Sequence, residues 1–276
     1  MTFFCFRSLS KALRSGVPWL PLLCSATVFA SVPALEVLVY ADESYPPYSY
    51  VEYGQLKGVY PEIFQKIFSQ MPAYSVRMVP VAWKRGLLLL EQGRGFALFP
   101  PYMRQEERPY MSYSDPVLTE ETAVFCLSEV AAFRKRGQWP DDFAGLRIAT
   151  NFGFATGGGK FEEMVSHHLL LKDEGPGNRS NILKLLHRRV DCYINDRLSV
   201  LWEMDRIYAE FPRLQKTVAI AEMGTIRREN AYLGFTNLNP AQFPFKEDFV
   251  LQFNRVLRGM RERGEIAEIL LRYQRP

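Results

Sequence analysis

The sequence contains few of the residues that carry covalent or metal-dependent chemistry. Among 276 residues there are three histidines and four cysteines, and the motifs G-x-S-x-G, H-E-x-x-H and C-x-x-C do not occur. His167 and His168 are adjacent, and adjacent side chains point in different directions on a helix, so a shared metal site is not expected. The glycines before Lys160 lack the phosphate-loop pattern because Phe161 follows the lysine. We therefore expect no metal, no cofactor and no catalytic residues.

The sequence also lacks a strong charge of either sign. Its net charge is +4, and Arg7, Lys11 and Arg14 account for three of these charges within the first 34 residues, which contain no acid. The rest of the chain therefore carries a net charge of about +1. Because a nucleic-acid-binding protein needs a basic surface, we expect no nucleic-acid partner. There is no internal repeat and no low-complexity segment.

Only one hydrophobic run is long enough to suggest a targeting segment. Residues 1–34 resemble a secretory signal peptide, with a basic start, an apolar stretch over 17–30 and small-residue cleavage sites after Ala30 and after Ala34. The apolar stretch is short and contains two prolines, so it does not indicate a transmembrane helix. We expect export to the periplasm.

The alternative fate of this leader is a lipoprotein acylated at Cys24. Leu23 stands directly before that cysteine, where lipoprotein signals have a small residue, so this alternative is disfavoured. Removal of the leader leaves Cys126 and Cys192 in an oxidising compartment. They form either a disulfide or two separately buried thiols, and sequence spacing cannot distinguish the two.

The stretch 97–118 is the one around which the chain is organised. An apolar strand over 97–99 ends at Pro100 and Pro101, and Arg108 follows within a short turn. Such a strand presents a cation at the carboxyl edge of an open α/β sheet, where ligands bind. The alternative is that Arg108 is an exposed arginine paired with Glu106 or Glu107.

Apolar spacing predicts the remaining elements. Strands are expected over 36–41, 74–81, 121–127, 146–151, 190–195 and 231–235. Helices are expected from Pro61 and over 84–92, 159–171, 180–189, 197–211, 245–260 and 265–273.

The order of motifs along this stretch resembles the family 3 extracellular solute-binding proteins, the polar amino-acid receptors of ABC importers. In that family the arginine of T-x-x-R binds the ligand's carboxylate, and F-S-D-P-Y follows. Arg108 takes the place of that arginine, and Y-S-D-P ending at Pro116 stands for the second motif. The resemblance continues with D-x-x-Y-x-P-F, here Asp42, Tyr45 and Tyr48, and with Trp83 before a helix.

The second half of the chain resembles the same family. The family's G-x-x-G-S/T turn, whose amides meet the ligand's carboxylate, corresponds to the segment containing Phe154, Ala155 and Thr156. The run ending at Asp196 resembles the motif whose last aspartate binds the ligand's α-amino group, although Asp196 can also be only a helix N-cap.

The sequence departs from the family pattern at several positions. Phe96 stands where the family has an aspartate, Pro100 and Pro101 where amino-acid receptors have serines, and Gln105 where they have a threonine. The segment after Arg108 is also one residue short. These departures leave the identity of the ligand open.

The resemblance implies an α/β protein with the type II periplasmic-binding-protein fold, two α/β lobes joined by two crossing strands. One lobe is expected to comprise residues 35–123 and 236–276, and the other residues 124–235. The implied ligand-binding residues are Asp42, Tyr45, Tyr48, Trp83, Pro101, Tyr102, Arg108, Phe154, Ala155, Thr156 and Asp196.

The resemblance further implies a monomer that binds a small solute, an amino acid or related zwitterion, and delivers it to an ABC permease. Two alternatives remain open. One is a periplasmic enzyme similar to cyclohexadienyl dehydratases, which have the same fold with a general acid in the cleft. The other is a stand-alone sensory receptor.

Overall fold

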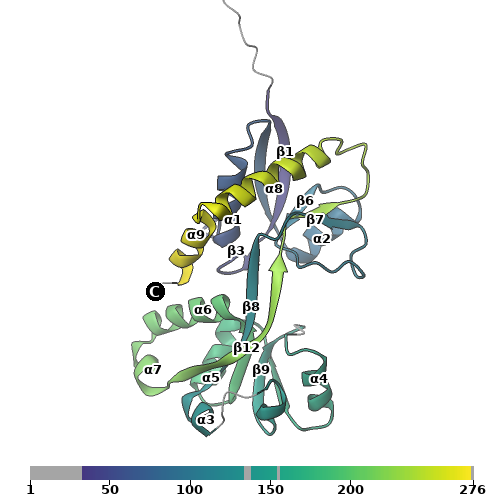
Figure 1. The fold of residues 1–276 in the computed structure, drawn as a ribbon. Helices are drawn as coiled ribbons and strands as arrows, with labels where there is room; N and C mark the ends of the chain where they lie inside the picture. The colour runs from purple at the N-terminus through teal and green to yellow at the C-terminus, as the bar shows by residue number, and fades with distance from the viewer. Residues whose placement is uncertain (1–32, 134–137, 154–155, 275–276) are drawn as a thin grey trace, which may run out of the picture. The chain divides into compact units, whose positions relative to one another are not determined.

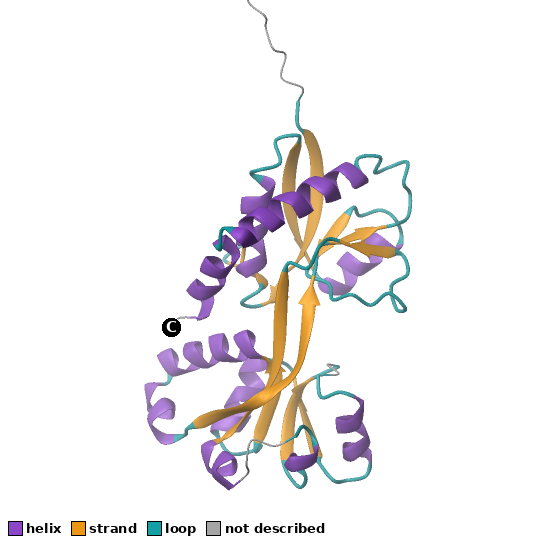
Figure 2. Ribbon diagram, in the orientation of Figure 1, coloured by secondary structure: helices purple, strands orange, loops and turns teal. Residues whose placement is uncertain are grey.

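Two five-stranded sheets and a smaller three-stranded sheet organise the chain (Figure 2). The computed structural model describes residues 33–133, 138–153 and 156–274. All but the last two residues of the expected leader therefore lie outside the described residues, as do Phe154 and Ala155.

The first large sheet has the strand order β5-β1-β6-β13-β7. β1 runs parallel to both β5 and β6, whereas β13 is antiparallel to β6 and β7. In β1 the side chains of Val37, Val39 and Ala41 alternate toward the core, as expected for a strand with one buried face. The strands are β1 (Leu35–Asp42), β5 (Tyr74–Val81), β6 (Ala97–Phe99), β7 (Met111–Tyr113) and β13 (Gly234–Thr236).

The second large sheet has the strand order β10-β9-β11-β8-β12. β9, β10 and β11 are parallel, and β8 is antiparallel to both β11 and β12. The strands are β8 (Leu118–Leu127), β9 (Arg147–Asn151), β10 (Leu171–Gly175), β11 (Cys192–Asp196) and β12 (Ile220–Ala231). The small sheet contains β2 (Ser44–Tyr45), β3 (Ser49–Glu52) and β4 (Gln55–Lys57).

Helices cover both large sheets (Figure 1). Those of the first sheet are α1 (Val59–Phe68), α2 (Trp83–Glu91), α8 (Lys246–Glu262) and α9 (Glu265–Gln274). Those of the second are α3 (Ser128–Phe133), α4 (Gly159–Ser166), α5 (Asn178–Leu186), α6 (Arg197–Glu210) and α7 (Pro212–Thr217), with a 3-10 turn at Asp141–Phe143.

Aromatic side chains form the core between the first sheet and its helices. Phe64 of α1 contacts Phe99 of β6 at a ring distance of 4.4 Å and Phe253 of α8 at 5.6 Å. Phe96, at the position where the family has an aspartate, is buried and packs edge-on against Phe249 at 5.1 Å. Each such buried side chain stabilises the fold by roughly 1.5–3 kcal/mol.

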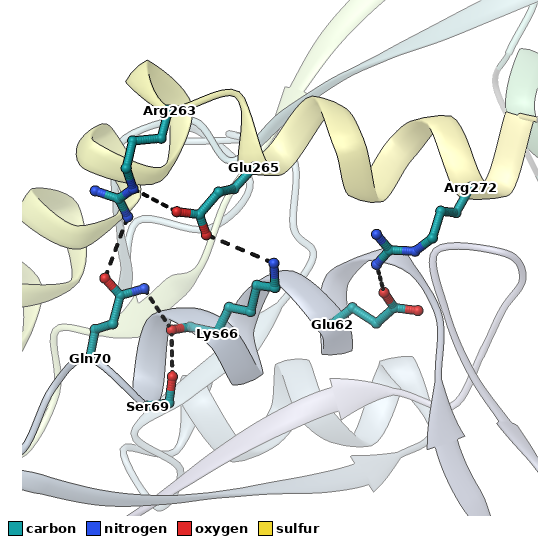
Figure 3. A network of polar contacts seen from close by, with 7 residues as sticks. All are labelled: Glu62, Lys66, Ser69, Gln70, Arg263, Glu265 and Arg272. Atoms are coloured by element: carbon teal, nitrogen blue, oxygen red, sulfur yellow. Dashed lines mark hydrogen bonds and ion pairs between the residues drawn. The ribbon is translucent and has the colours of Figure 1, made fainter.

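Polar contacts on the surface join the C-terminal helices to α1 (Figure 3). Lys66 lies 3.8 Å from Glu265, which also accepts a hydrogen bond from Arg263 at 2.6 Å, and Arg272 pairs with Glu62. Exposed pairs of this kind contribute about 0–1 kcal/mol each, so the aromatic core holds these helices in place.

Two long strands, β8 and β12, pair with each other and connect the two sheets (Figure 1). The architecture is thus two α/β lobes joined by two crossing strands, as expected. The predicted return crossing over 231–235 is wrong, because β12 makes that crossing and ends at Ala231. Two register shifts interrupt β12, between Glu222 and Gly224 and between Thr225 and Arg227, and they remove the alternation that marks a strand in the sequence.

The predicted helix over 159–171 is too long. α4 ends at Ser166, and His168 has a φ of 58°, which continues no helix. Leu171 instead begins the strand β10.

The two remaining cysteines form a disulfide. Cys126 of β8 and Cys192 of β11 are directly opposite in the antiparallel ladder, and the Sγ–Sγ distance is 2.01 Å. Of the two alternatives that the sequence left open, the disulfide is therefore the one that the structure shows. Within the described residues, no helix is both long and apolar enough to cross a membrane.

Candidate functional site

The carboxyl ends of three parallel strands meet at one edge of the first sheet. β1 ends at Asp42, β5 ends at Val81, two residues before Trp83, and β6 ends at Phe99, directly before Pro100. β1 lies between β5 and β6, so the chain moves from β1 to one side and then to the other. Such a switch point opens a crevice where ligands of α/β proteins bind.

A cavity of about 240 Å³ opens at this edge. It takes residues from both lobes, because Asp196 at the end of β11 faces residues of the first sheet. Seven of the eleven residues that the sequence predicted line it: Asp42, Tyr45, Trp83, Tyr102, Arg108, Thr156 and Asp196. The other lining residues are Pro100, Arg104, Thr122, Asn195, Arg227 and Glu229.

Arg108 projects a half-buried guanidinium to this cavity. Its carbon lies 5.8 Å from the ring centroid of Trp83, and its Nη1 donates a long hydrogen bond of 3.5 Å to the carbonyl of Tyr102. Among the described residues it forms no ion pair, so it does not pair with Glu106 or Glu107. A cation without a carboxylate partner at a cavity wall can bind an anionic group of a ligand.

Asp196 presents a carboxylate on the side of the cavity that the second lobe forms. Its Oδ1 accepts the amide of Ser199 at 2.8 Å, so it caps α6, and its Oδ2 accepts the Tyr48 hydroxyl at 3.0 Å. The residue is buried, and this burial raises its pKa to about 6, although both hydrogen bonds oppose the shift. The N-cap and cavity-lining roles are compatible in this geometry.

Asp42 is a second carboxylate of the cavity. Its Oδ1 accepts the amide of Ser44 at 3.0 Å, and burial raises its pKa to about 6. Together, Asp42 and Asp196 can attract a cationic group, while Arg108 attracts an anionic one. The cavity can therefore hold both charges of a zwitterion.

Sequence reasoning missed a buried carboxyl next to the cavity. Glu120 of β8 accepts hydrogen bonds from Tyr45 and Tyr102, each at 2.5 Å, and from Tyr60. Burial, and then the nearby charge of Asp196, raises its pKa to about 7. Glu120 thus positions Tyr45 and Tyr102, two of the aromatic walls of the cavity.

Sequence reasoning also missed a charged cluster from the turn before Arg108 and from β12. Glu229 pairs with Arg104 and with Arg227, the latter at 2.7 Å. The Nε of Arg227 is buried and has no hydrogen-bond partner in the described chain. Side chains two residues apart lie on the same face of a strand, so Arg227 and Glu229 lie side by side on β12. Had β12 been predicted from the sequence, this pair would have been a candidate for the site.

Thr156 is the described residue of the turn between β9 and α4 that lines the cavity. Its hydroxyl oxygen is buried and has no hydrogen-bond partner among the described residues. The hydroxyl can therefore donate to a ligand. The predicted contacts of Phe154 and Ala155 lie outside the described residues.

Two predicted residues lie close to the cavity without lining it. Tyr48 is buried behind Tyr45, with ring centroids 5.0 Å apart, and acts on the cavity through Asp196. Pro101 is buried, and its carbonyl accepts the amide of Tyr232 at 3.0 Å, so Pro100 and not Pro101 reaches the cavity.

No group of three or more metal-ligating side chains is arranged around a common point in the described part of the chain.

Comparisons with known proteins agree with this geometry. A family model described as bacterial extracellular solute-binding proteins, family 3, matches residues 37–276. No curated protein sequence matches the chain.

Solved structures of similar fold include an ancestral amino acid-binding protein described as a precursor of cyclohexadienyl dehydratase. It is 16% identical, with a TM-score of 0.60, over 87% of this chain and 95% of that one. A structure described under glutathione import via GshT and the cystine ABC importer TcyBC of Streptococcus mutans is 15% identical, with a TM-score of 0.64, over 88% of this chain and 95% of that one. A histidine kinase sensor domain is 17% identical, with a TM-score of 0.60, over 87% and 96%.

Proposed function

Because this chain belongs to the bacterial extracellular solute-binding proteins of family 3, we propose that it is a periplasmic receptor for an amino acid or related zwitterion. Its fold is the type II periplasmic-binding-protein fold. In this proposal the protein acts as a monomer, binds the solute between its two lobes and delivers it to an ABC permease.

One observation carries this proposal. One cavity is lined both by Arg108, which has no ion-pair partner among the described residues, and by the carboxylates of Asp196 and Asp42. Its volume of about 240 Å³ lies below the roughly 300–1,000 Å³ of sites for drug-sized ligands, so it suits a small solute. We assign the ligand's carboxylate to Arg108 and Thr156, its amine to Asp196 and Asp42, and its side chain to the walls formed by aromatic residues.

Binding in this scheme requires a hinge motion and no chemistry. The ligand contacts residues of both lobes, so it stabilises the arrangement in which the lobes meet. A permease would recognise that arrangement.

A thermal-shift screen of ligand-stripped protein against the common amino acids, small polyamines and prephenate tests the proposal. A ligand at a hundredfold excess over its Kd adds about 2.7 kcal/mol to the free energy of unfolding, which raises Tm by several degrees. We expect a shift with one class of amino acid.

The Arg108→Ala variant provides the residue-level test. Removal of a buried charge that pairs with a ligand costs about 2–5 kcal/mol, so affinity should fall at least about 30-fold. The matched control is Arg255→Ala, which removes an exposed arginine from α8 and should leave both Tm and affinity unchanged. Equal binding by wild type and Arg108→Ala would contradict the assigned role.

A specific observation favours a second candidate, an enzyme similar to cyclohexadienyl dehydratases. Asp196 lines the cavity and has a raised pKa of about 6, so it can carry a proton near neutral pH, as a general acid must. Turnover of prephenate, together with no shift by any amino acid, would replace the receptor proposal with this one.

The third alternative, a stand-alone sensory receptor, has the same binding site and differs in its partner. A similarly folded histidine kinase sensor domain motivates it. Genes for a permease and an ATPase beside the gene for this chain would favour transport, and their replacement by a kinase gene would favour sensing.

A further inference from the structure

A second, larger cavity adjoins the first. Its volume is about 710 Å³, and Tyr45 and Asn195 line both cavities. The remaining lining residues come from β2 and the residue after it, from the carboxyl end of β9, from α5 and the residues before it, and from α6, which contributes Glu203. A free amino acid bound at Arg108 would leave this space empty.

A network of three asparagines and a tyrosine forms the polar wall of the second cavity. Asn178 Oδ1 accepts hydrogen bonds from the Nδ2 of Asn195 at 2.7 Å and from the Nδ2 of Asn151 at 2.9 Å. The Tyr193 hydroxyl lies 2.9 Å from both Asn178 Oδ1 and Asn151 Oδ1 and donates its one proton to either. Two amide donors already use both lone pairs of the Asn178 oxygen. The Nδ2 of Asn178 donates no hydrogen bond within the described chain, so Asn178 offers the cavity a donor.

Asn195, which lines both cavities, offers a hydrogen-bond acceptor where they meet. Its side chain is almost completely buried, at 5% exposure, and its Nδ2 donates to Asn178 and to Tyr193. Its Oδ1 accepts no hydrogen bond from any described residue. Because Asn195 lines both cavities, this oxygen offers an acceptor to a bound ligand.

A donor at Asn178 and an acceptor at Asn195 together match an amide group, which has one N–H and one C=O. Beyond them, the first turn of α5 has no side-chain cap at Gly177, so its amides remain available to a carboxylate. Phe152 and Leu183 add apolar surface to the same cavity. Arg179 is already paired, with Glu203 and Glu210.

We propose that the ligand is an amino acid whose side chain continues through an amide into an apolar group that ends in a carboxylate, as in a γ-glutamyl dipeptide. This inference rests on the proposed function, because Arg108, Asp196 and Asp42 hold the amino-acid head. The amide passes Asn195 and Asn178, and the second carboxylate reaches the N-terminus of α5. The two cavities together reach the volume typical of sites for ligands of that size.

The test compares γ-glutamyl-leucine with free glutamine, free leucine and the remaining amino acids by isothermal titration calorimetry on the purified protein. We expect γ-glutamyl-leucine to bind at least tenfold more tightly than the best free amino acid. Free amino acids that bind as tightly or more tightly would overturn the inference and leave the proposed function intact. If neither γ-glutamyl-leucine nor any free amino acid binds, both fail.

The Asn178→Asp variant tests whether Asn178 binds the ligand's amide. An aspartate keeps the oxygen that accepts hydrogen bonds from Asn151 and Asn195 but replaces the Nδ2 donor with a second acceptor, and an acid is favourable in the first turn of a helix. Affinity for γ-glutamyl-leucine should fall at least tenfold, while affinity for the best free amino acid should change less than threefold. Equal losses for both ligands, or none for either, would contradict the second subsite.

The matched control is Asn254→Asp on α8. Asn254 also accepts a hydrogen bond through Oδ1, from the amide of Asp115 at 2.9 Å, and lies outside both cavities. The Asn254→Asp substitution introduces the same chemical change outside both cavities. We expect the affinities for γ-glutamyl-leucine and for the best free amino acid to remain as in the wild type.

Discussion

Three tyrosines from separate segments of the chain surround the carboxyl of Glu120. Tyr45 comes from β2, Tyr60 from α1 and Tyr102 from the segment after β6, and each donates a hydrogen bond to the Glu120 carboxyl. The carboxyl is buried and has a pKa of about 7, compared with 4.5 for an ordinary glutamate. Its protonation therefore links the site to pH.

We predict that Glu120 makes the wild type less stable as pH rises from about 4.5 to about 7. In that range the unfolded chain releases the proton while the folded chain retains it, so the free energy of unfolding falls, and above pH 7 the loss is complete. The total loss of stability is on the order of 3 kcal/mol, because one pKa unit corresponds to about 1.4 kcal/mol.

Urea unfolding of wild type and Glu120→Gln at several pH values measures this contribution. The stability difference between them should decline over that pH range and then level off. A difference that is constant with pH would contradict the prediction. Glu106→Gln, which changes an exposed acid, serves as the control and should give a constant difference.

At the scale of single residues, the sequence predicted the charged residues that line the cavity, Arg108 and Asp196, but not the buried Glu120 that holds the tyrosines of the cavity wall in place. Asp196 ends β11, and Arg108 lies in the turn region after β6, so the local pattern of a strand followed by a break places both at a sheet edge. Glu120 could not be predicted, because its burial depends on tyrosines 18 to 75 residues away. Arg227 and Glu229 were missed with their strand.

At the scale of elements, the second sheet is covalently joined between two of its strands. The disulfide links Cys126 of β8 to Cys192 at the start of β11, and Asp196 lies at the other end of β11. A crosslink that closes a loop of this length, 66 residues in sequence, stabilises a protein by about 4 kcal/mol in the chain-entropy account.

We predict that Cys126→Ala/Cys192→Ala lowers Tm by roughly 10 °C, which corresponds to a loss of about 4 kcal/mol for a protein of this size. Ligand affinity at 25 °C should change less than twofold, because the disulfide lies away from the cavity residues. Dithiothreitol should lower Tm of the wild type and have no effect on the double variant. An unchanged Tm in the double variant would refute the stabilising role.

The elements that the sequence predicted correctly are those with a regular apolar pattern. The helix from Pro61 and the strand that became β5 both show it, and both are present. β12 was missed because its two register shifts place polar residues irregularly between its buried positions. The antiparallel pairing of β8 with β12 is therefore seen in the structure and could not be predicted from the apolar pattern of the sequence.

At the scale of the whole molecule, residues 1–34 are expected to direct export and then to be removed. The first strand begins at Leu35, directly after the second expected cleavage site. The described strands and helices therefore begin where cleavage after Ala34 would leave the new N-terminus.

We predict that the protein purified from the periplasm begins at Ser31 or at Leu35, which intact-mass spectrometry and N-terminal sequencing determine. A cytoplasmically produced chain that begins at Leu35, refolded with its disulfide, should unfold at the same temperature within about 2 °C. A lipid-modified N-terminus at Cys24, lost in Cys24→Ala, would instead establish the lipoprotein alternative. A start at Met1 would exclude cleavage altogether.

The first sheet draws its strands from both ends of the sequence, and this has a consequence for the order in which the chain folds. β13 and α8 supply Phe235, Phe249 and Phe253 to a core that α1 began about 170 residues earlier, and α9 adds Ile266 and Ile269. The second sheet is made from one continuous segment, so its contacts are closer in sequence and form sooner. In a chain that emerges from its N-terminus, the second lobe can therefore fold before the last 45 or so residues, which complete the first lobe, are available.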